Sequence, residues 1–362
     1  MSKILYVIGF YPNNPRNLKM IKNLKREYNV KCCFWNNQKN IIEKEDKEEY
    51  IFTSNKIKSK LSKFFNIFFF YKYLKKTVKE YNPDCIFAYH WDIFILVKMA
   101  TIFNKKIKIG YDISDIPAYK GILHKIIKRI EEFFIDDKVL LMFASPYFQE
   151  KYDKYIKNFK IVINNKPEMS FLEEYEKEKK EHKDLIISFF GVFRDFEVFK
   201  NIFLAAENLP IKLKMYGSGF EKENIKEYSK NFKNIYIGNE FKAEELPKLY
   251  SDVDVILSLY SNKDENTKLA LGNKFFESLI LKKIGIFPKN TKMGKYILKR
   301  KLGFVVNPYD VEEIREAFVS ILNDSEYSQK VKQNLLNLEK EKLFYEYEIK
   351  KFLPLLEEFI KC

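Results

Sequence analysis

Residues 185–194 read Leu-Ile-Ile-Ser-Phe-Phe-Gly-Val-Phe-Arg, an apolar run of strand length that reaches a glycine and then an arginine. The run does not alternate between apolar and polar residues, which is typical of a parallel strand covered on both faces. Similar short runs follow at 211–216, 235–237, 253–257, 284–287 and 304–306. With helical segments between the runs, this pattern predicts a doubly wound α/β domain over residues 185–325.

The same alternation occurs in the first half of the chain. Apolar runs lie at 4–8, 30–35, 85–89, 107–111, 139–144 and 161–163, and amphipathic stretches at 17–28, 123–134 and 146–157 lie between them. Residues 166–184 interrupt the pattern with Lys-Pro-Glu and a dense run of charges. We therefore predict two Rossmann-like domains of parallel sheet that face each other across a cleft. The expected divisions are a first domain at 1–165, a charged linker at 166–184, a second domain at 185–325, and C-terminal helices at 326–362 that return to pack on the first domain.

Composition limits the classes of protein that fit. A chain of 362 residues is long enough for two cores. The apolar N-terminal run stops at Gly9 without the features of a signal peptide, and no apolar stretch of about 20 residues exists to span a bilayer. The four cysteines lack the spacing of a zinc site or a redox pair. These features predict a reduced, cytoplasmic protein.

The positive charge is concentrated in the first half. Residues 1–165 contain 31 Lys or Arg against 17 Asp or Glu, whereas residues 166–362 contain 34 against 33. This asymmetry predicts an anionic partner, which could be a lipid surface, a phosphate-bearing acceptor or a nucleic acid. Residues 56–79 contain eight lysines around an aromatic centre and no acidic residue. Such a segment suits a helix in the headgroup layer of an anionic membrane, to which the basic stretch 122–130 would add, and equally suits a core helix with solvated lysines.

The loops that follow the strands of the second domain contain residues suited to a phosphorylated ligand. Gly191 permits a close backbone approach, and Arg194 precedes a predicted helix whose N-terminus favours anions. Gly217 and Gly219 open another helix. Asn273, Lys274 and Glu277 belong to Asn-Lys-Phe-Phe-Glu at 273–277, where amides could receive phosphate oxygens and Glu277 could accept from a ribose diol. Its flanks Phe275, Phe276 and Leu279 are apolar, which argues against plain exposure of Glu277.

The order of these motifs carries a family resemblance. Phe-x-Gly-x-x-Arg at 189–194, Tyr-Gly-Ser-Gly at 216–219, Ile-Gly-Asn-Glu-Phe at 237–241 and Asn-Lys-Phe-Phe-Glu at 273–277 are followed by Lys-Lys-Ile-Gly-Ile. Together they resemble the donor domain of bacterial GT-B glycosyltransferases, and most closely glycosyltransferase family 4 members that build capsular and other surface polysaccharides. The resemblance covers about residues 185–325 and is only thematic over 1–165. It implies a nucleotide-sugar donor whose diphosphate lies at Gly191 and Arg194, whose base lies along 238–241, including Gly238 and Glu240, and whose ribose is held by Glu277.

The sequence departs from the family pattern in two places. The glutamate expected eight positions before Glu277 is Leu269, so a contact to the donor sugar would come from another residue, such as Asp264, Glu265 or Asn266. The glycine-rich loop after the first strand is reduced to Gly9, which we assign to the acceptor side. Both departures bear on which sugar is transferred.

Two loops of the first half compete for the acceptor and chemical roles. His90 follows one strand, and Asp112 and Asp115 follow another; by the resemblance, these aspartates lie where a polar residue is directed at the transferred sugar or the acceptor. The resemblance implies retention of anomeric configuration, with the leaving phosphate taking the acceptor proton. An inverting enzyme would need a base, for which Asp112 is the candidate. His90 could equally cap a strand end, and Asp115 could be a turn or cap residue.

We expect no metal and no other cofactor. Asp252 and Asp254 form an Asp-x-Asp, but they precede an apolar run and suit a structural role. Two other functions remain open: a sugar-nucleotide epimerase of the same architecture, and a nucleic-acid-binding protein. The second is disfavoured because no nucleic-acid-binding motif is present and the donor-like loops would be unexplained.

Overall fold

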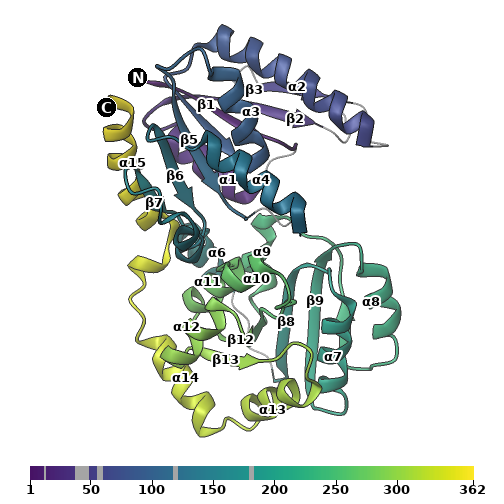
Figure 1. Cartoon of the computed structure of the whole chain (residues 1–362). Helices are drawn as coiled ribbons and strands as arrows, with labels where there is room; N and C mark the ends of the chain where they lie inside the picture. The colour runs from purple at the N-terminus through teal and green to yellow at the C-terminus, as the bar shows by residue number, and fades with distance from the viewer. Residues whose placement is uncertain (12–13, 37–48, 55–59, 117–120, 179–182) are drawn as a thin grey trace. The chain divides into compact units, whose positions relative to one another are not determined.

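The computed structural model describes the chain except for residues 12–13, 37–48, 55–59, 117–120 and 179–182 (Figure 1). The chain divides into two compact units, one of Met1–Ile163 with Glu348–Cys362 and one of Asn164–Tyr347. Each unit contains a parallel β-sheet with helices on both faces, so the predicted class of two doubly wound α/β domains is confirmed. Within the described ranges, no helix combines the length and the apolarity that crossing a membrane requires.

The first unit is built on a seven-stranded sheet, among the described residues, in the order β3-β2-β1-β4-β5-β6-β7. Its strands are β1 (Lys3–Ile8), β2 (Asn29–Asn36), β3 (Glu49–Thr53), β4 (Cys85–Tyr89), β5 (Lys108–Ile113), β6 (Val139–Phe143) and β7 (Lys160–Val162). Its helices are α1 (Pro15–Leu24), α2 (Lys60–Tyr81), α3 (Trp91–Thr101), α4 (Gly121–Phe134), the short α5 (Pro146–Gln149) and the end of α15 (Tyr345–Lys361).

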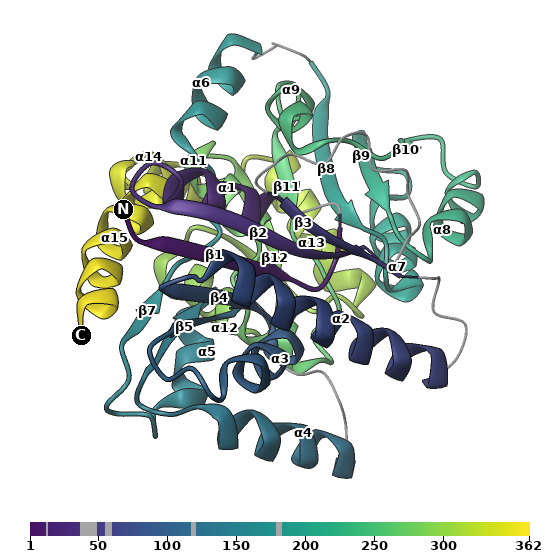
Figure 2. The same ribbon diagram turned by 90° about the horizontal axis from the view of Figure 1, so that it is seen from above.

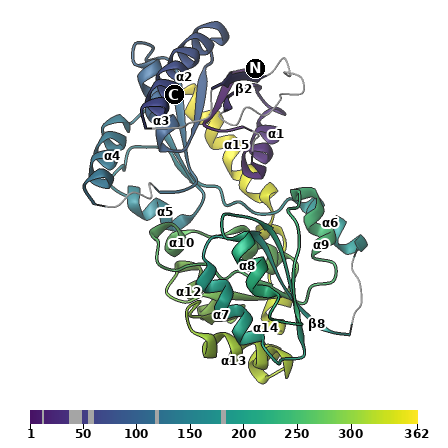
Figure 3. The ribbon, with the colours of Figure 1, turned by 90° about the vertical axis from the view of Figure 1, so that its right-hand side faces the viewer.

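Helices cover both faces of this sheet (Figure 3). On one face, Phe94 of α3 stacks on Tyr111 of β5, with 4.2 Å between ring centroids, and α2 and α4 flank α3. On the other face, Phe352 of α15 packs against Phe87 of β4. The strands β1, β4, β5 and β6 are almost fully buried, as their continuous apolar runs predicted, whereas the edge strands β3 and β7 are partly exposed.

The second unit has a six-stranded sheet in the described part of the chain, ordered β10-β9-β8-β11-β12-β13. Its strands are β8 (Leu185–Val192), β9 (Ile211–Ser218), β10 (Ile235–Ile237), β11 (Val255–Leu257), β12 (Ile284–Pro288) and β13 (Gly303–Val306). Its helices are α6 (Met169–Glu178), α7 (Phe196–Ala206), α8 (Lys222–Ser229), α9 (Leu246–Leu249), α10 (Glu265–Leu269), α11 (Asn273–Ile280), α12 (Lys292–Arg300), α13 (Val311–Leu322) and α14 (Glu326–Leu336).

Two segments of the structure differ from the divisions predicted from the sequence. Residues 166–184 are not a bare linker, because they include α6, whose Phe171, Leu172 and Tyr175 pack into a core cluster with Tyr250. Residues 179–182 of that segment lie outside the described residues. Of the C-terminal stretch 326–362, helix α14 belongs to the second unit, since Val331 and Leu335 lie in its core, and only the part from Glu348 belongs with the first unit.

Candidate functional site

The carboxyl ends of β8 and β9 meet at three glycines. Gly191 and Gly217 are direct neighbours across the two strands. Gly217 has a φ of +150°, and a Cβ there would lie 1.7 Å from the carbonyl oxygen of Gly191. Gly219 has a φ of +144°, and its Cβ would lie 2.2 Å from the carbonyl oxygen of Phe193. Only glycine fits either position, so the two loops form a closely packed backbone surface.

Lys274 brings a positive charge to this surface. It lies in the first turn of α11 and is only 5% exposed. Its Nζ lies 2.8 Å from the point that a Cβ on Gly191 would occupy, and 4.6 and 5.0 Å from the ring centroids of Phe189 and Tyr260. No described residue forms an ion pair with Lys274. Because a buried ammonium is costly without an anionic partner, this arrangement is suited to an anion bound beside Gly191.

Glu277 lies one turn further along α11, on the same helix face as Lys274. It is 6% exposed, so the burial predicted from its apolar flanks is present. The hydroxyl of Tyr250 donates to Oε2 of Glu277 at 2.6 Å. Burial, and then the charge of Glu277, raise the pKa of Tyr250 well above its ordinary value, so the phenol stays a donor and holds the carboxylate in place. A carboxylate can accept several hydrogen bonds, so one from Tyr250 does not exhaust its capacity.

Arg194 lies just before Asp195, the N-cap residue of α7, and is exposed. Its side chain forms no ion pair with the described residues. The adjacent Asp195 is held by Tyr309, whose hydroxyl donates to Oδ2 at 2.6 Å. Burial, followed by the hydrogen bond to Asp195, raises the pKa of Tyr309 to about 12. This neighbour is therefore fixed, whereas the guanidinium can extend from the start of α7 toward a ligand.

The segment predicted to line a nucleotide base begins beside an aromatic cluster. A Cβ on Gly238 would lie 2.3 Å from Cδ1 of Tyr216, so this backbone rests directly on the tyrosine ring. Phe190 contacts Tyr216, Phe241 and Tyr250, with ring centroids 5.7, 5.8 and 4.6 Å apart. Glu240 is exposed. Asn273 is also exposed and accepts a hydrogen bond at 2.8 Å from Nδ2 of Asn165.

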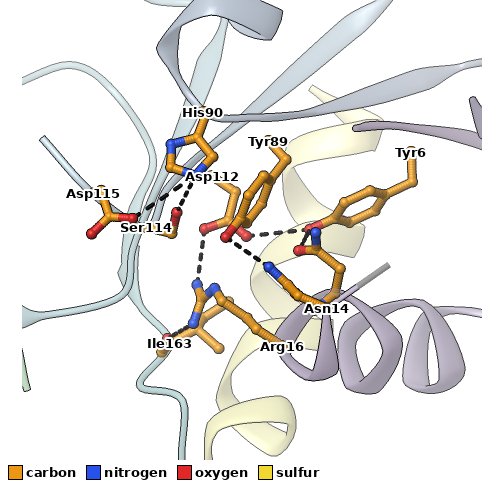
Figure 4. A network of polar contacts seen from close by, with 10 residues as sticks. Tyr6, Asn14, Arg16, Tyr89, His90, Asp112, Ser114, Asp115 and Ile163 are labelled. Atoms are coloured by element: carbon orange, nitrogen blue, oxygen red, sulfur yellow. Dashed lines mark hydrogen bonds and ion pairs between the residues drawn. The ribbon is translucent and has the colours of Figure 1, made fainter. Parts of the chain in front are cut away.

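A second polar network lies in the first unit, at the carboxyl ends of β1, β4 and β5 (Figure 4). Asp112 is fully buried; its Oδ1 pairs with Nη2 of Arg16 at 2.8 Å, and its Oδ2 accepts from the hydroxyl of Tyr6 at 3.2 Å. Nη1 of Arg16 donates to the carbonyl of Ile163 at 2.8 Å. These contacts hold the Asp112 carboxylate in an ion pair inside the fold. This geometry favours a structural role for Asp112 over that of a base that reaches a substrate, the role predicted for it in an inverting enzyme.

His90 and Asp115 occupy the more exposed side of this network. His90 has a φ of +72°, a region that non-glycine residues rarely adopt and that recurs at functional sites. Its Nε2 lies 3.2 Å from Oγ of Ser114 and 3.9 Å from Oδ2 of Asp115. The Asp115 side chain is 54% exposed. Gly9 directly follows β1 and lies beside α3, with its Cβ position 3.1 Å from Cδ1 of Ile93.

The residues that sequence reasoning missed are partners of the predicted ones. Arg16, Tyr6 and Tyr250 hold Asp112 and Glu277. Asn14 caps α1 by accepting from the amide of Asn17 at 2.9 Å, and its Nδ2 donates to the hydroxyl of Tyr89 at 3.1 Å. The Asn14-Pro15 pair was a usable signal, because asparagine at the N-cap followed by proline at the first helical position marks a helix start.

The Asp-x-Asp pair has structural partners. Asp252 pairs with Nζ of Lys214, and Oδ2 of Asp254 accepts from the amide of Ile186 at 2.9 Å. The part of the chain that the structure describes contains no group of three His, Cys, Asp or Glu residues placed to hold a metal ion.

No family model matches the chain, and no relative is found among curated proteins. Several solved structures are similar in fold over the whole length. Sucrose-phosphate synthase from Thermosynechococcus elongatus has a TM-score of 0.76 and 11% identity, covering 100% of both chains. HepE from Anabaena, in complex with UDP, has a TM-score of 0.73 and 14% identity, covering 99% of this chain and 100% of that one. UDP-GlcNAc 2-epimerase from Neisseria meningitidis, bound to UDP-GlcNAc, has a TM-score of 0.65 and 14% identity, covering 98% of this chain and 100% of that one. At these identities the likeness shows a shared fold, the GT-B fold, which consists of two Rossmann-like domains.

Proposed function

We propose that this protein is a glycosyltransferase that moves a sugar from a nucleotide-sugar donor to a glycan or lipid-linked acceptor in bacterial surface polysaccharide synthesis. The observation that carries the proposal is the buried Lys274 beside Gly191, one turn before the buried Glu277. This pair offers a cation for a diphosphate and a carboxylate for a ribose on one face of α11. Complexes of HepE with UDP and with UDP-glucose support a uridine diphosphate sugar as the donor. The order of motifs in the second unit supports the narrower assignment to glycosyltransferase family 4.

In the proposed reaction, the bond between the anomeric carbon and the diphosphate oxygen breaks, and negative charge develops on the leaving diphosphate. Lys274 and Arg194 stabilise that charge, which is the main contribution a protein makes to such a step. The acceptor hydroxyl forms the new bond and gives its proton to the leaving phosphate. This route gives retention and needs no protein base, in keeping with the ion pair that holds Asp112. We assign His90 and Asp115 to positioning the acceptor.

A panel of UDP, GDP, CMP and their sugars in thermal-shift measurements tests the donor class. Ligands that bind the folded state raise the melting temperature, and the stabilisation grows with the logarithm of one plus the ratio of free ligand concentration to Kd. We expect a rise with one nucleoside diphosphate and its sugars. If none of these ligands shifts the transition, the nucleotide site is misassigned.

An epimerase is the second candidate, because one of the similar folds is UDP-GlcNAc 2-epimerase. An epimerase converts its sugar nucleotide without an acceptor, whereas a transferase needs one. Incubation with the donor alone, followed by chromatography of the sugar nucleotides, separates the two. We expect no conversion to an epimer; its appearance would favour the epimerase.

Replacing Lys274 by Met should weaken binding of nucleoside diphosphate by about ten- to a hundredfold, because a charge-assisted hydrogen bond contributes about 1.5–3 kcal/mol. Affinity for the nucleoside alone should stay close to that of the parent, since only the phosphate contact is lost. Calorimetric titration with both ligands measures the difference. Lys283→Met, which alters another lysine of the same unit that lies over an aromatic ring, is the matched control. Equal losses for nucleoside and diphosphate would show that Lys274 supports the fold and not the phosphate.

Activity should not require a divalent metal, because Lys274 and Arg194 supply fixed positive charge for the leaving diphosphate. Once a donor is identified, the rate in excess EDTA should match the rate with magnesium. A loss of activity that only a metal restores would overturn this assignment of the diphosphate site.

A further inference from the structure

Three neighbouring helices of the first unit expose apolar side chains. On α2, the side chains of Phe64, Phe65, Phe68 and Phe69 are exposed, Phe64 by 66%. On α4, the exposed apolar residues are Ile122, Ile126, Ile130 and Phe133, and Phe133 is 82% exposed. At the end of α3, Met99, Ile102 and Phe103 are exposed. Phenylalanine and isoleucine usually lie in the core, and their exposure in such numbers on neighbouring helices points to an interaction surface.

The pattern on α4 has helical spacing. Ile122, Ile126, Ile130 and Phe133 follow one another at intervals of four, four and three residues, so they form one stripe along the helix. The opposite side of α4 is already used by the fold. There Ile127 is buried, and Glu131 accepts hydrogen bonds from the hydroxyls of Tyr111 and Tyr152, both at 2.6 Å. The exposed stripe is therefore additional to the packing face.

The helices α2, α3 and α4 lie side by side on one face of the sheet (Figures 2 and 3), and α3 contacts both of the others. Their outward residues therefore belong to one surface, which we call the basic apolar face: the exposed apolar residues of α2, α3 and α4 named above, with the lysines and arginine among them. Strand β5 ends at Ile113 and α4 starts at Gly121. Ile122 therefore lies toward the carboxyl ends of the strands, as do His90 and Asp115.

Basic side chains accompany the apolar ones. The exposed basic residues of α2 and α4 include Lys72, Lys75, Lys76, Lys79, Lys125, Lys128 and Arg129, and the exposed Lys105 and Lys106 follow α3. Nζ of Lys72 lies 4.5 Å from the ring centroid of the exposed Phe68, so a positive charge lies directly beside an exposed apolar side chain. Part of the excess positive charge of residues 1–165 therefore lies on the same helices that expose the apolar side chains.

We infer that the basic apolar face binds the surface of an anionic lipid bilayer, with the phenylalanine and isoleucine side chains in the headgroup layer and the lysines on lipid phosphates. Apolar insertion combined with lysine contacts is the pattern of helices that lie in a membrane interface. A nucleic acid would use the lysines but gains nothing from an isoleucine stripe, since aliphatic side chains do not stack on bases. This inference goes beyond the proposed function, because vesicle binding needs no nucleotide. It would hold the loops that contain His90 and Asp115 close to a lipid-linked acceptor.

Sedimentation with vesicles tests the inference on the full chain. Vesicles of phosphatidylcholine with about a third phosphatidylglycerol should bind the protein, and pure phosphatidylcholine vesicles should bind it far less. Binding should decline with salt, because salt screens contacts between exposed charges. Ile126→Ser with Phe133→Ser, and separately Phe64→Ser with Phe68→Ser, should each reduce the partition coefficient by about tenfold or more. Lys72→Gln with Lys75→Gln should reduce it by about tenfold or more as well.

Matched controls come from the second unit. Leu298 and Leu336 are 58% and 62% exposed, so Leu298→Ser with Leu336→Ser removes apolar surface elsewhere. Lys226→Gln with Lys233→Gln removes two exposed lysines there. Both control pairs should bind vesicles like the parent. Calorimetric affinity for the nucleoside diphosphate should be unchanged in every variant, which separates this result from failure of the proposed function.

Three outcomes would overturn the inference. One is binding to neutral vesicles as strong as to anionic ones, or no binding to either. Another is loss of binding in the lysine pair alone with the apolar pairs unaffected, which would indicate a purely electrostatic surface for a polyanion. The third is conversion of a dimer to a monomer by the apolar pairs, measured by sedimentation velocity, with vesicle binding retained; the face would then be an interface between two copies of the chain.

Discussion

Replacing Arg16 by Met should lower the free energy of unfolding of the first unit by about 3–5 kcal/mol, the largest effect we expect from a single substitution. The side chains of Arg16 and Asp112 are 6% and 0% exposed, and their closest atoms are 2.8 Å apart. Removing the guanidinium leaves the Asp112 carboxylate buried, with the hydroxyl of Tyr6 still donating to it (Figure 4). The full cost of burying that charge then opposes folding. Urea denaturation followed by circular dichroism measures the loss.

Two controls separate the ion pair from general damage. Arg16→Met combined with Asp112→Leu should lose less than the single variant, because no uncompensated charge remains. Lys214→Met breaks the partly exposed pair with Asp252 in the second unit, where the side chains are 27% and 32% exposed, and should cost about 1 kcal/mol or less. If the single Arg16 variant is no less stable than the parent, the ion pair does not hold this part of the fold.

The same site allows the two roles considered for Asp112 to be separated by kinetics. Asp112→Asn keeps an acceptor for the hydroxyl of Tyr6 but removes the negative charge that pairs with Arg16. If Asp112 is structural, stability should fall while kcat of the folded protein changes little. General base catalysis contributes about a hundredfold to ten-thousandfold, so a loss of that size in a stably folded variant would restore Asp112 as a base.

The sequence predicted the fold well because buried parallel strands are visible in it as short, continuous apolar runs. Runs such as 85–89 and 284–287 coincide with β4 and with β12 up to its last residue, since both faces of each strand are covered and every position is apolar or small. The edge strand β3 was missed: Glu49–Thr53 is half-exposed and follows an acidic stretch, so its pattern resembles a polar loop. The helix α6 was missed for a related reason. Its many charges mask the apolar residues Phe171, Leu172 and Tyr175 that pack it against α9.

The site was predictable only where it depends on local sequence. Burial of Glu277 follows from its apolar neighbours on α11. The glycines at 217 and 219 are visible in the sequence, and the structure shows that only glycine fits there. The partners were not predictable, because Tyr250 is 27 positions from Glu277 and Arg16 is 96 positions from Asp112. Such pairs are determined by which strands become neighbours in the sheet. One sequence specifies the strands more clearly than their order, so it does not reveal that Arg16 pairs with Asp112.

Replacing Glu277 by Gln should weaken binding of both nucleoside and nucleoside diphosphate by about ten- to a hundredfold, because hydrogen bonds from ribose hydroxyls to a charged acceptor contribute about 1.5–3 kcal/mol. Gln keeps the shape of the side chain and a carbonyl oxygen that can accept from Tyr250, so the fold should be retained. Arg194→Lys should instead weaken binding of the diphosphate alone, since only the fork geometry of the guanidinium is lost. The two variants therefore separate ribose recognition from diphosphate recognition in one set of calorimetric titrations.

Two further variants decide whether the carboxylate acts directly. Tyr250→Phe removes the hydrogen bond that orients Glu277 at 2.6 Å but leaves its charge, so nucleoside affinity should fall by less than in Glu277→Gln. Glu348→Gln alters an equally buried glutamate, 1% exposed and paired with Lys351 in the first unit, and should leave nucleotide binding unchanged. A smaller loss for Tyr250→Phe than for Glu277→Gln, with none for Glu348→Gln, would place the ribose at Glu277 and give Tyr250 a positioning role. A folded Glu277→Gln protein that binds nucleotide like the parent would remove the ribose assignment, and with it the strongest support for a donor site on α11.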